Sequence, residues 1–177
     1  RRCIGMFAFS LWDKKEQTLS LVRDRMGEKP LYYGWQGKGA KRTFLFGSEL
    51  KSLRQHPAWQ GGVDRDALAN LLRYNYIPAP LTIHPGVYKL RPGYLLQLKK
   101  NDNGGWSERE ECWWSLQEVA QQAKKNPFTG SRADAVDHLD KLLRDAIQGQ
   151  SLADVPLGMF LSGGVDSSSV AAVMQAI

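Results

Sequence analysis

The stretch Val155-Pro-Leu-Gly-Met-Phe-Leu161 runs directly into Ser162-Gly-Gly-Val-Asp-Ser-Ser168 and then into a short segment that ends at Ile177. Residues 155–161 are almost continuously apolar, which predicts a buried strand, and residues 169–177 predict a helix. A strand, a glycine turn and a helix in this order are how parallel α/β domains begin. The sequence therefore predicts the start of an α/β parallel-sheet domain at this end.

The turn between this strand and this helix is chemically suited to bind phosphate. Gly163 and Gly164 have no side chains, so their amides can approach an anion closely, and the helix directs its unpaired N–H groups at the same place. Three residues add hydroxyl donors: Ser162, Ser167 and Ser168. Asp166 adds a carboxylate, which suits a polyphosphate when Mg²⁺ lies between the two. The alternative interpretation is a tight connection in which serine caps the helix.

The first part of the chain alternates short apolar segments with turn residues, which predicts an antiparallel meander. Strands are expected over residues 4–12, 19–22, 31–35, 43–46, 87–90 and 94–98. The first of these contains few polar residues, so we expect it to be covered on both faces. One helix interrupts the meander, with Asp64 as N-cap and an apolar face that ends at Tyr76, before Ile77-Pro-Ala-Pro80.

The middle of the chain changes in composition. Residues 106–130 are polar and rich in tryptophan without a clear period, which predicts a connector. Ser131 then opens a helix, with Asp134 three residues on as in a capping box. We therefore expect a first domain over 1–104, a connector over 105–130 and a second domain over 131–177.

Charge and cysteine content exclude some classes of protein. Lys and Arg total 24 against 18 Asp and Glu in 177 residues, but the basic pairs are scattered over turns, so we predict no nucleic-acid partner. No apolar run approaches the roughly 18 to 20 residues of a membrane span, so we predict no membrane association. Two cysteines fit a reduced cytoplasm. The start at Arg1, without an initiator Met, indicates a piece of a longer chain.

Several motifs together resemble one family. Leu161-Ser-Gly-Gly-Val-Asp-Ser-Ser168 is similar to the pyrophosphate-binding loop of the ATP pyrophosphatases, and with Ser151-Leu-Ala-Asp-Val-Pro156 before it most resembles the synthetase domain of glutamine-hydrolysing asparagine synthetase. The first half resembles the N-terminal glutaminase domain of that family in Gly5-Met-Phe-Ala-Phe9, Arg23-Asp-Arg-Met-Gly-Glu-Lys-Pro-Leu-Tyr-Tyr33, Gly47-Ser-Glu-Leu-Lys-Ser-Leu53, Tyr76-Ile-Pro-Ala-Pro80 and Lys89-Leu-Arg-Pro-Gly93.

The resemblance implies a fold and an activity. The fold would be α+β, the C-terminal part of a class II glutamine amidotransferase domain with an N-terminal nucleophile, followed by the start of the α/β ATP-pyrophosphatase domain. The family is a cytoplasmic ligase that uses ATP, Mg²⁺ and glutamine to make asparagine from aspartate through a β-aspartyl adenylate, and a homodimer of the full-length protein is compatible with it. Another carboxylate acceptor (a sugar acid, a peptide or a β-lactam precursor) and a non-catalytic relic fragment remain alternatives.

The resemblance also assigns residues. Leu161 matches the position whose backbone meets adenine, and Asp166 is the expected Mg²⁺ ligand. The pyrophosphate loop would comprise Ser162, Gly163, Gly164, Asp166, Ser167 and Ser168. The family's catalytic cysteine and glutamine-binding residues would lie upstream of Arg1, so this chain is expected to hold no catalytic residue and to be inactive alone. Two arginines precede Cys3, which excludes it as that nucleophile, and Cys112 is expected to pack.

Two further features are interpreted from the residues alone. Arg23, Asp24 and Arg25 follow the second predicted strand, and they predict either a contact surface between the two domains or a structural turn with a local ion pair. The three histidines, His56, His84 and His138, have no Glu or His at metal-ligand spacing, which favours loop or surface positions over a zinc site.

Overall fold

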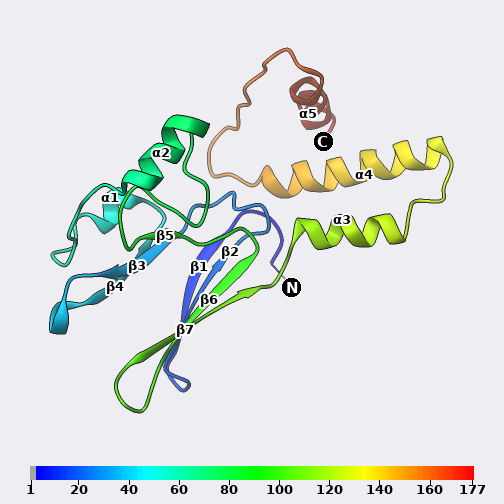
Figure 1. Ribbon diagram of the computed structural model, residues 1–177. Coiled ribbons are helices and arrows are strands. Elements are labelled where there is room, and N and C mark those ends of the chain that lie inside the picture. Colours follow the sequence, from blue (N-terminus) through cyan, green and yellow to red (C-terminus); the bar gives the residue numbers. More distant parts are fainter. Residues whose placement is uncertain (1–2) are drawn as a thin grey trace. The chain divides into compact units, whose positions relative to one another are not determined.

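The computed structural model describes residues 3–177, which divide into two compact units. The first unit is Met6–Leu116, and the second comprises Gln117–Ile177 together with residues 3–5. Among the described residues, the strands all lie in the first unit, and the second unit is helical (Figure 1). Each unit is described by itself below.

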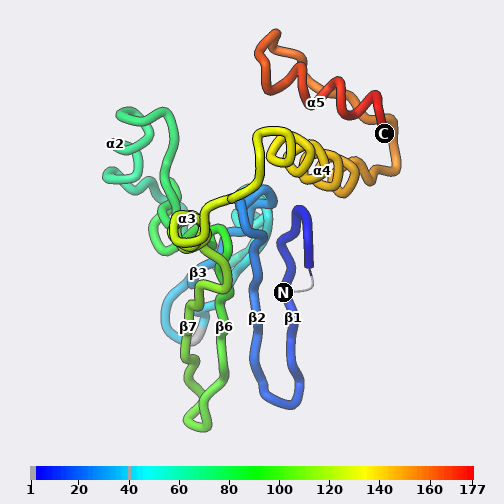
Figure 2. Tube along the Cα trace, turned by 90° about the vertical axis from the view of Figure 1, so that its right-hand side faces the viewer, coloured from blue at the N-terminus to red at the C-terminus, as the bar shows by residue number. Residues whose placement is uncertain are grey.

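Two antiparallel sheets form the first unit (Figures 1 and 2). The larger sheet has the order β1-β2-β6-β7, with bounds Ala8–Asp13, Thr18–Arg23, Tyr94–Lys100 and Trp106–Cys112. The smaller has the order β4-β3-β5, with bounds Thr43–Gly47, Tyr32–Gln36 and Tyr88–Lys89. The predicted antiparallel pairing is confirmed. The strand order is more complex than a meander, because β6 returns to pair with β2 while β3, β4 and β5 form the second sheet.

The core of the first unit lies between these sheets. Six buried side chains form its main cluster: Leu21, Leu31, Tyr33, Leu90, Leu96 and Leu98. A second cluster joins Leu45 and Val87 to Leu53 of the short helix α1, Leu50–Leu53. Leucines at alternate positions of β2 and β6 form the larger sheet's part of this core, because alternate residues of a strand point to the same face. Burial of these side chains is the main contribution that holds the two sheets together.

The prediction that the first strand is covered on both faces is wrong. β1 is the edge strand of its sheet, and Phe9, Leu11 and Trp12 remain 41%, 61% and 41% exposed. The apolar run predicted a strand over residues 4–12, whereas the strand forms only over Ala8–Asp13, and the run could not reveal its place in the sheet. Edge and central strands can carry the same apolar sequence, because cover depends on what packs against them.

Residues 106–130, in which the sequence shows no clear period, contain regular structure. β7 extends the larger sheet over Trp106–Cys112, and helix α3 follows over Leu116–Lys125. The polar residues of β7 have partners in the other sheet: Glu110 accepts a hydrogen bond from the Tyr33 hydroxyl at 2.5 Å, and Glu108 accepts one from the Trp35 indole at 2.5 Å. Burial, together with the Glu110 carboxylate, raises the pKa of Tyr33.

Helix α2, Arg65–Tyr74, begins at the predicted N-cap. A carboxylate oxygen of Asp64 accepts the backbone N–H groups of Asp66 at 2.9 Å and Ala67 at 3.0 Å. The helix ends earlier than the predicted Tyr76, because Asn75 adopts the left-handed conformation with φ of 61°. Asparagine tolerates this conformation better than most residues do, so the sequence carried a stop signal upstream of the prolines.

Replacement of Asp64 tests the contribution of this cap. We expect Asp64→Ala to lower the free energy of unfolding by about 1 kcal/mol, because two helical N–H groups lose their acceptor. Asp64→Ser keeps a capping oxygen and should retain most of the stability. Urea unfolding followed by far-UV circular dichroism measures both variants. Equal losses in the alanine and serine variants would contradict a capping role.

The second unit contains α3, α4 (Arg132–Gln150) and α5 (Val165–Ala176). The predicted capping box is confirmed: the Ser131 hydroxyl accepts the Asp134 N–H at 3.2 Å, and the Asp134 carboxylate accepts the Ser131 N–H at 2.8 Å. Hydrogen bonds from the Ser131 side chain and backbone lower the pKa of Asp134. Helices α4 and α5 contact one another. In the described part of the chain, no helix is both long and apolar enough to cross a membrane.

The predicted buried strand over residues 155–161 does not form in this structure. These residues form no regular element and are exposed, with Phe160 at 99% exposure. A strand needs a neighbouring strand to accept and donate its backbone hydrogen bonds, and the described residues place none beside it. The apolar pattern is therefore present, but the neighbouring strands that would make this segment a strand are absent from the described residues.

Candidate functional site

The glycine-rich turn leads directly into helix α5, as the sequence predicts, but the helix begins earlier. It starts at Val165 rather than Ser169, with Gly164 as N-cap in an extended conformation. Asp166 and Ser167 therefore lie in the first helical turn. The N–H groups of this turn have no acceptors within the helix, so they are available to an anion together with the positive end of the helix dipole.

Gly163 is the residue of the turn whose backbone conformation favours glycine. Its φ is +79°, in the left-handed region, and a Cβ built at this position would meet no atom within 4 Å. The open space means that only the backbone conformation, and no neighbouring atom, restricts the residue at this position. A bound group could therefore approach this backbone from a side on which no protein atom lies within reach.

Two serine hydroxyls hold the turn in shape. The Ser162 and Ser167 hydroxyl oxygens lie 3.0 Å apart, and Ser167 also donates to the carbonyl oxygen of Gly164 at 3.2 Å. The side chains of Leu161, Asp166 and Ser168 are exposed. The structure thus brings together all the positions that the sequence assigned to the loop, on one short stretch of the second unit.

This arrangement fits a nucleotide phosphate. Backbone N–H groups, hydroxyls and a helix N-terminus are the groups that bind phosphate oxygens in proteins. Asp166 is the one carboxylate in the loop, and the described residues contain no group of three His, Cys, Asp or Glu side chains placed to hold a metal. Mg²⁺ commonly binds through one or two carboxylates with phosphate oxygens and water, so Asp166 would hold it only together with the phosphates.

In the first unit, Asp24 organises the turn after β2. Its side chain is 1% exposed and accepts backbone N–H groups from Phe7 at 3.4 Å, Met26 at 3.1 Å, Glu28 at 2.9 Å and Lys29 at 2.9 Å. Burial acts to raise the pKa of Asp24, but the hydrogen bonds from these backbone groups outweigh it and hold the pKa below its ordinary value. These contacts support the structural-turn interpretation of this motif.

Arg23 complements Asp24 by binding carbonyl groups. It donates to the carbonyl oxygens of Lys29 at 2.8 Å, Leu90 at 2.6 Å and Gly27 at 2.6 Å. Burial lowers the pKa of Arg23, although Asp24 opposes this effect. The hydrogen bonds of both side chains go to the backbone, in place of the predicted ion pair. Arg25 remains exposed, and its assignment to a surface between the domains stays a prediction.

A family model for the glutamine amidotransferase domain matches residues 1–114, well over half of the chain. The chain belongs to this family. In this amidotransferase chain, the match covers both antiparallel sheets of the first unit, including β7. A second family model, described as asparagine synthase, matches residues 138–177, which include most of α4 and the loop before α5.

Curated relatives match nearly the whole amidotransferase chain. An asparagine synthetase (glutamine-hydrolysing) of Bacillus subtilis is 35% identical over 170 residues, which are 96% of this chain and 25% of the relative. A putative asparagine synthetase of Methanocaldococcus jannaschii is 33% identical, over 97% of this chain and 31% of its own length. A Gibberella zeae protein named amidase chry2 is 32% identical, over 97% and 23%. The chain spans less than a third of each of these relatives.

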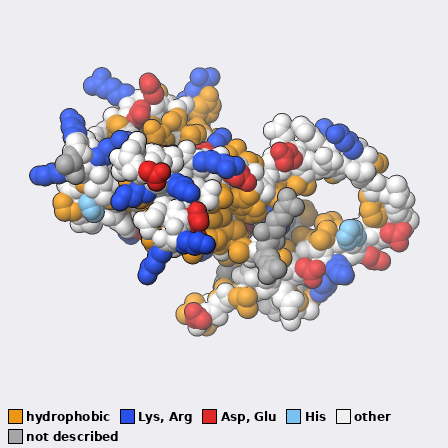
Figure 3. Space-filling view, turned by 90° about the horizontal axis from the view of Figure 1, so that it is seen from below, with side chains coloured by type: hydrophobic (Ala, Val, Ile, Leu, Met, Phe, Trp, Pro, Cys, Tyr) orange, Lys and Arg blue, Asp and Glu red, His pale blue; other side chains and the backbone are white. Residues whose placement is uncertain are grey.

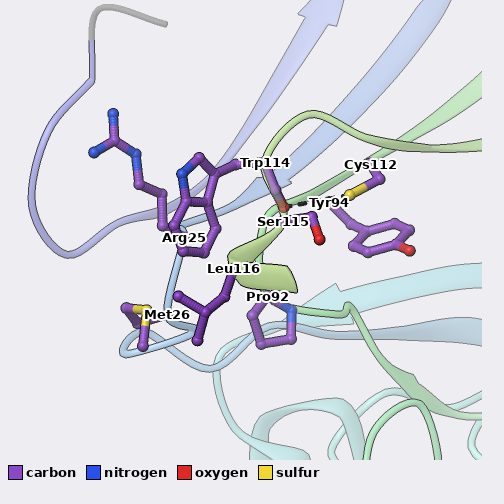
Figure 4. Close-up of a pocket in the computed structure, with 8 residues that line it drawn as sticks. All are labelled: Arg25, Met26, Pro92, Tyr94, Cys112, Trp114, Ser115 and Leu116. Atoms are coloured by element: carbon purple, nitrogen blue, oxygen red, sulfur yellow. Dashed lines mark hydrogen bonds between the residues drawn. The ribbon is translucent and has the colours of Figure 1, made fainter. Parts of the chain in front are cut away.

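A shallow pocket lies beside the Asp24 turn (Figure 4). Its volume is about 320 Å³, and it is lined by Arg25, Met26, Pro92, Tyr94, Cys112, Trp114, Ser115 and Leu116. The prediction that Cys112 packs is wrong, because the residue is exposed and its thiol donates to the carbonyl oxygen of Trp114 at 3.3 Å. Cys112 ends β7, and the exposed burial pattern of that strand explains the difference.

The histidines of the amidotransferase chain make local contacts. The Nδ1 atom of His56 accepts the backbone N–H of Ala58 at 3.1 Å, and Nδ1 of His84 lies 2.7 Å from the carbonyl oxygen of Gly62. His138 packs against the ring of Phe128 in the second unit. The contact of His56 is within its own turn, whereas His84 and His138 contact residues of a neighbouring segment.

Proposed function

We propose that the full-length protein is an ATP-dependent, glutamine-hydrolysing amidotransferase that makes asparagine from aspartate through a β-aspartyl adenylate. The observation that carries the proposal is the order of two domain signatures in one chain, a glutamine amidotransferase match over 1–114 followed by an asparagine synthase match over 138–177. Relatives named asparagine synthetase that match nearly the whole chain support the same assignment. We propose correspondingly that the amidotransferase part, a connector and the synthetase part follow in this order.

The loop before α5 would bind ATP during adenylation. Its amides, with Ser162 and Ser167, would neutralise the pyrophosphate that leaves when the aspartate carboxylate attacks the α-phosphate. Asp166 would hold Mg²⁺ against the same phosphates, and the metal would supply further charge stabilisation. The backbone of Leu161 would face adenine, and Ser168 would complete the loop.

Glutamine hydrolysis would be the task of a cysteine upstream of this chain. By resemblance to the family, that nucleophile would be at the first position of the full-length protein, where its own α-amine would serve as the base. We therefore propose that the 177-residue chain alone is inactive. Glutamine-dependent formation of asparagine by this chain alone would contradict that proposal.

A second candidate keeps adenylation and changes the acceptor. The relative named amidase chry2 is nearly as similar to this chain as the relatives named asparagine synthetase, and its name does not mention asparagine. An acid other than aspartate would react by the same chemistry, because the loop binds ATP and the acceptor pocket would be shaped by residues outside it.

Pyrophosphate exchange separates these candidates. The full-length protein is incubated with ATP, Mg²⁺, labelled pyrophosphate and one carboxylic acid at a time, and label entering ATP is measured. Exchange that requires aspartate supports asparagine synthesis, and exchange with another acid only supports the second candidate. We expect Asp166→Asn to reduce the exchange rate at least about 100-fold, because the phosphates lose the metal's carboxylate ligand.

Asp145→Asn is the matched control for this experiment, since Asp145 is an exposed aspartate of α4 in the same unit, outside the loop and outside the motifs that resemble the family. Its exchange rate should equal that of the unmodified protein. Exchange by Asp166→Asn at the rate of the control would show that the loop does not carry adenylation.

A further inference from the structure

The fold gathers basic residues that the sequence scatters. Seven basic residues lie in the turns β1–β2, β3–β4 and β6–β7 or at the strand ends beside them: Lys14, Lys15, Lys38, Lys41, Arg42, Lys99 and Lys100. The acidic residues of the same segments are Asp13, Glu16 and Asp102. The first and third turns are adjacent, because the Lys100 N–H donates to the carbonyl oxygen of Gln17 at 3.1 Å and Lys99 pairs with Glu16 at 3.4 Å. Figure 3 shows Lys and Arg side chains over this end of the first unit, with hydrophobic side chains between them.

An aromatic pocket opens at the same end of the first unit. Its volume is about 340 Å³, and it is lined by Leu19, Trp35, Arg42, Thr43, Phe44, Phe46, Leu98 and Trp106. Both sheets contribute, so the pocket lies where the two sheets separate. Trp106 and Phe46 are each 41% exposed, which is more than a closed core would leave. A pocket of this size suits one small molecule.

The rings of the pocket form a continuous series. Trp35 lies 5.2 Å from Phe44 and 6.4 Å from Trp106, and Trp106 lies 6.4 Å from Trp12, measured between ring centroids. The indole N–H of Trp35 is engaged by Glu108, which fixes the plane of this ring. Partly exposed aromatic rings held in this way are stacking surfaces for a planar ring of a ligand.

Cations stand beside these rings. The Arg42 guanidinium lies 4.8 Å from the centre of the Trp35 ring, in a cation–π arrangement. Lys100 pairs with Trp106 in the β6–β7 register, so both side chains leave the sheet on the same face. Glu108 is the acidic residue of this site, and its carboxylate is bound to Trp35. The pocket thus offers rings and positive charge together, which fits an anion that carries a planar ring.

We propose that this pocket binds a free nucleoside monophosphate, with the base stacked on Trp106 and the phosphate bound by Arg42 and Lys100. The site lies in the first unit, whereas the phosphate loop lies in the second, so it is a nucleotide site separate from the adenylation site. A nucleoside monophosphate bound there would act as an effector rather than as a substrate. The size of the pocket, which admits one ring system, favours a free nucleotide over a nucleic-acid strand.

The test is a titration of the full 177-residue chain with AMP, followed by tryptophan fluorescence. We expect saturable quenching, because Trp35 and Trp106 line the pocket. Arg42→Gln and Trp106→Leu should each weaken AMP binding about tenfold or more, since one removes a charge-assisted contact to phosphate and the other a stacking partner. Arg42 is an exposed residue, so its variant keeps the test valid if Trp106→Leu does not fold.

Arg73→Gln is the matched control, because Arg73 lies 5.2 Å from the Tyr74 ring in a cation–π pair on α2. It should bind AMP as the unmodified chain does, and so should the loop variant Gly163→Ala. Three results would overturn the proposal: no saturable quenching, unchanged AMP binding by Arg42→Gln, or loss of binding in Gly163→Ala alone. Equal competition by inorganic phosphate, or binding of an oligoadenylate about 100-fold tighter than AMP, would also overturn it by showing that an anion site or a nucleic-acid surface is present instead.

Discussion

Replacing Asp24 with alanine is expected to lower the free energy of unfolding of the first unit by about 3 kcal/mol. The carboxylate is fully buried and accepts backbone N–H groups from Phe7 and from three residues of the turn that follows it. Alanine removes all of these acceptors at once and leaves four partly buried N–H donors without this partner. The turn and the entry into β1 lose their common anchor, so a loss of this size is a large part of the stability of a small domain.

Guanidinium unfolding followed by tryptophan fluorescence measures this effect. Asp13→Ala is the matched control, because the exposed Asp13 also accepts two backbone N–H groups, from Lys15 and Glu16, and its removal should cost about 1 kcal/mol or less. Asp24→Asn keeps one acceptor oxygen and should fall between the two. Similar losses for the two alanine variants would show that burial of Asp24 adds nothing.

The pH dependence of stability follows from the same contacts. Because the folded state holds the pKa of Asp24 below its ordinary value, the unfolded chain binds a proton more readily than the folded chain does. The contribution of Asp24 is therefore fully present above the unfolded pKa of about 3.9, and it is lost as pH falls through the lower folded pKa. In Asp24→Asn this part of the acid sensitivity should be absent.

Local sequence signals predicted the structure well where one residue carries the information. Asp64 and Ser131 are helix caps in the sequence and in the structure, since capping depends on a side chain and on N–H groups within three residues of it. The glycine-rich turn is equally local, and Gly163 adopts the positive φ that glycine allows.

Long-range features could not be predicted in this way. Glu108 and Glu110 of β7 bind donors more than seventy residues away, which no local pattern in residues 106–130 indicates. The adjacency of Lys100 and Gln17 results from pairing between β2 and β6, which no local pattern encodes. This pairing also gathers the basic turns, which were interpreted as scattered charge when only the sequence was considered.

In the phosphate loop, too, the local features could be predicted and the long-range ones could not. Its turn could be predicted from Gly163 and Gly164, but the strand expected before it depended on neighbours. An apolar segment such as residues 155–161 indicates that its side chains need to be buried, but it does not indicate which other elements would cover them. The helix begins at Val165, before the predicted start at Ser169, because serine residues are compatible with a first helical turn. Their hydroxyls find local acceptors there.

Substitution of Gly163 by alanine in the full-length protein should reduce ATP-dependent pyrophosphate exchange about 100-fold or more. This result rests on the proposed adenylation function. A Cβ at this position would meet no atom within 4 Å, so steric conflict inside the protein is not the reason. The φ of +79° is costly for alanine, and relaxation toward negative φ would turn the loop amides away from the phosphates that they are proposed to bind.

Gly158→Ala provides the control for this prediction. A Cβ at Gly158 would also meet no atom within 4 Å, but Gly158 does not have a positive φ, so alanine fits its backbone. The two positions differ in whether their backbone φ is positive, and both have open space around the added Cβ. Exchange should therefore be preserved in Gly158→Ala and lost in Gly163→Ala, with both proteins melting within a few degrees of the unmodified one because the strain at Gly163 is about 1 kcal/mol. Equal exchange rates in the two variants would show that the left-handed turn at Gly163 is not needed to bind ATP.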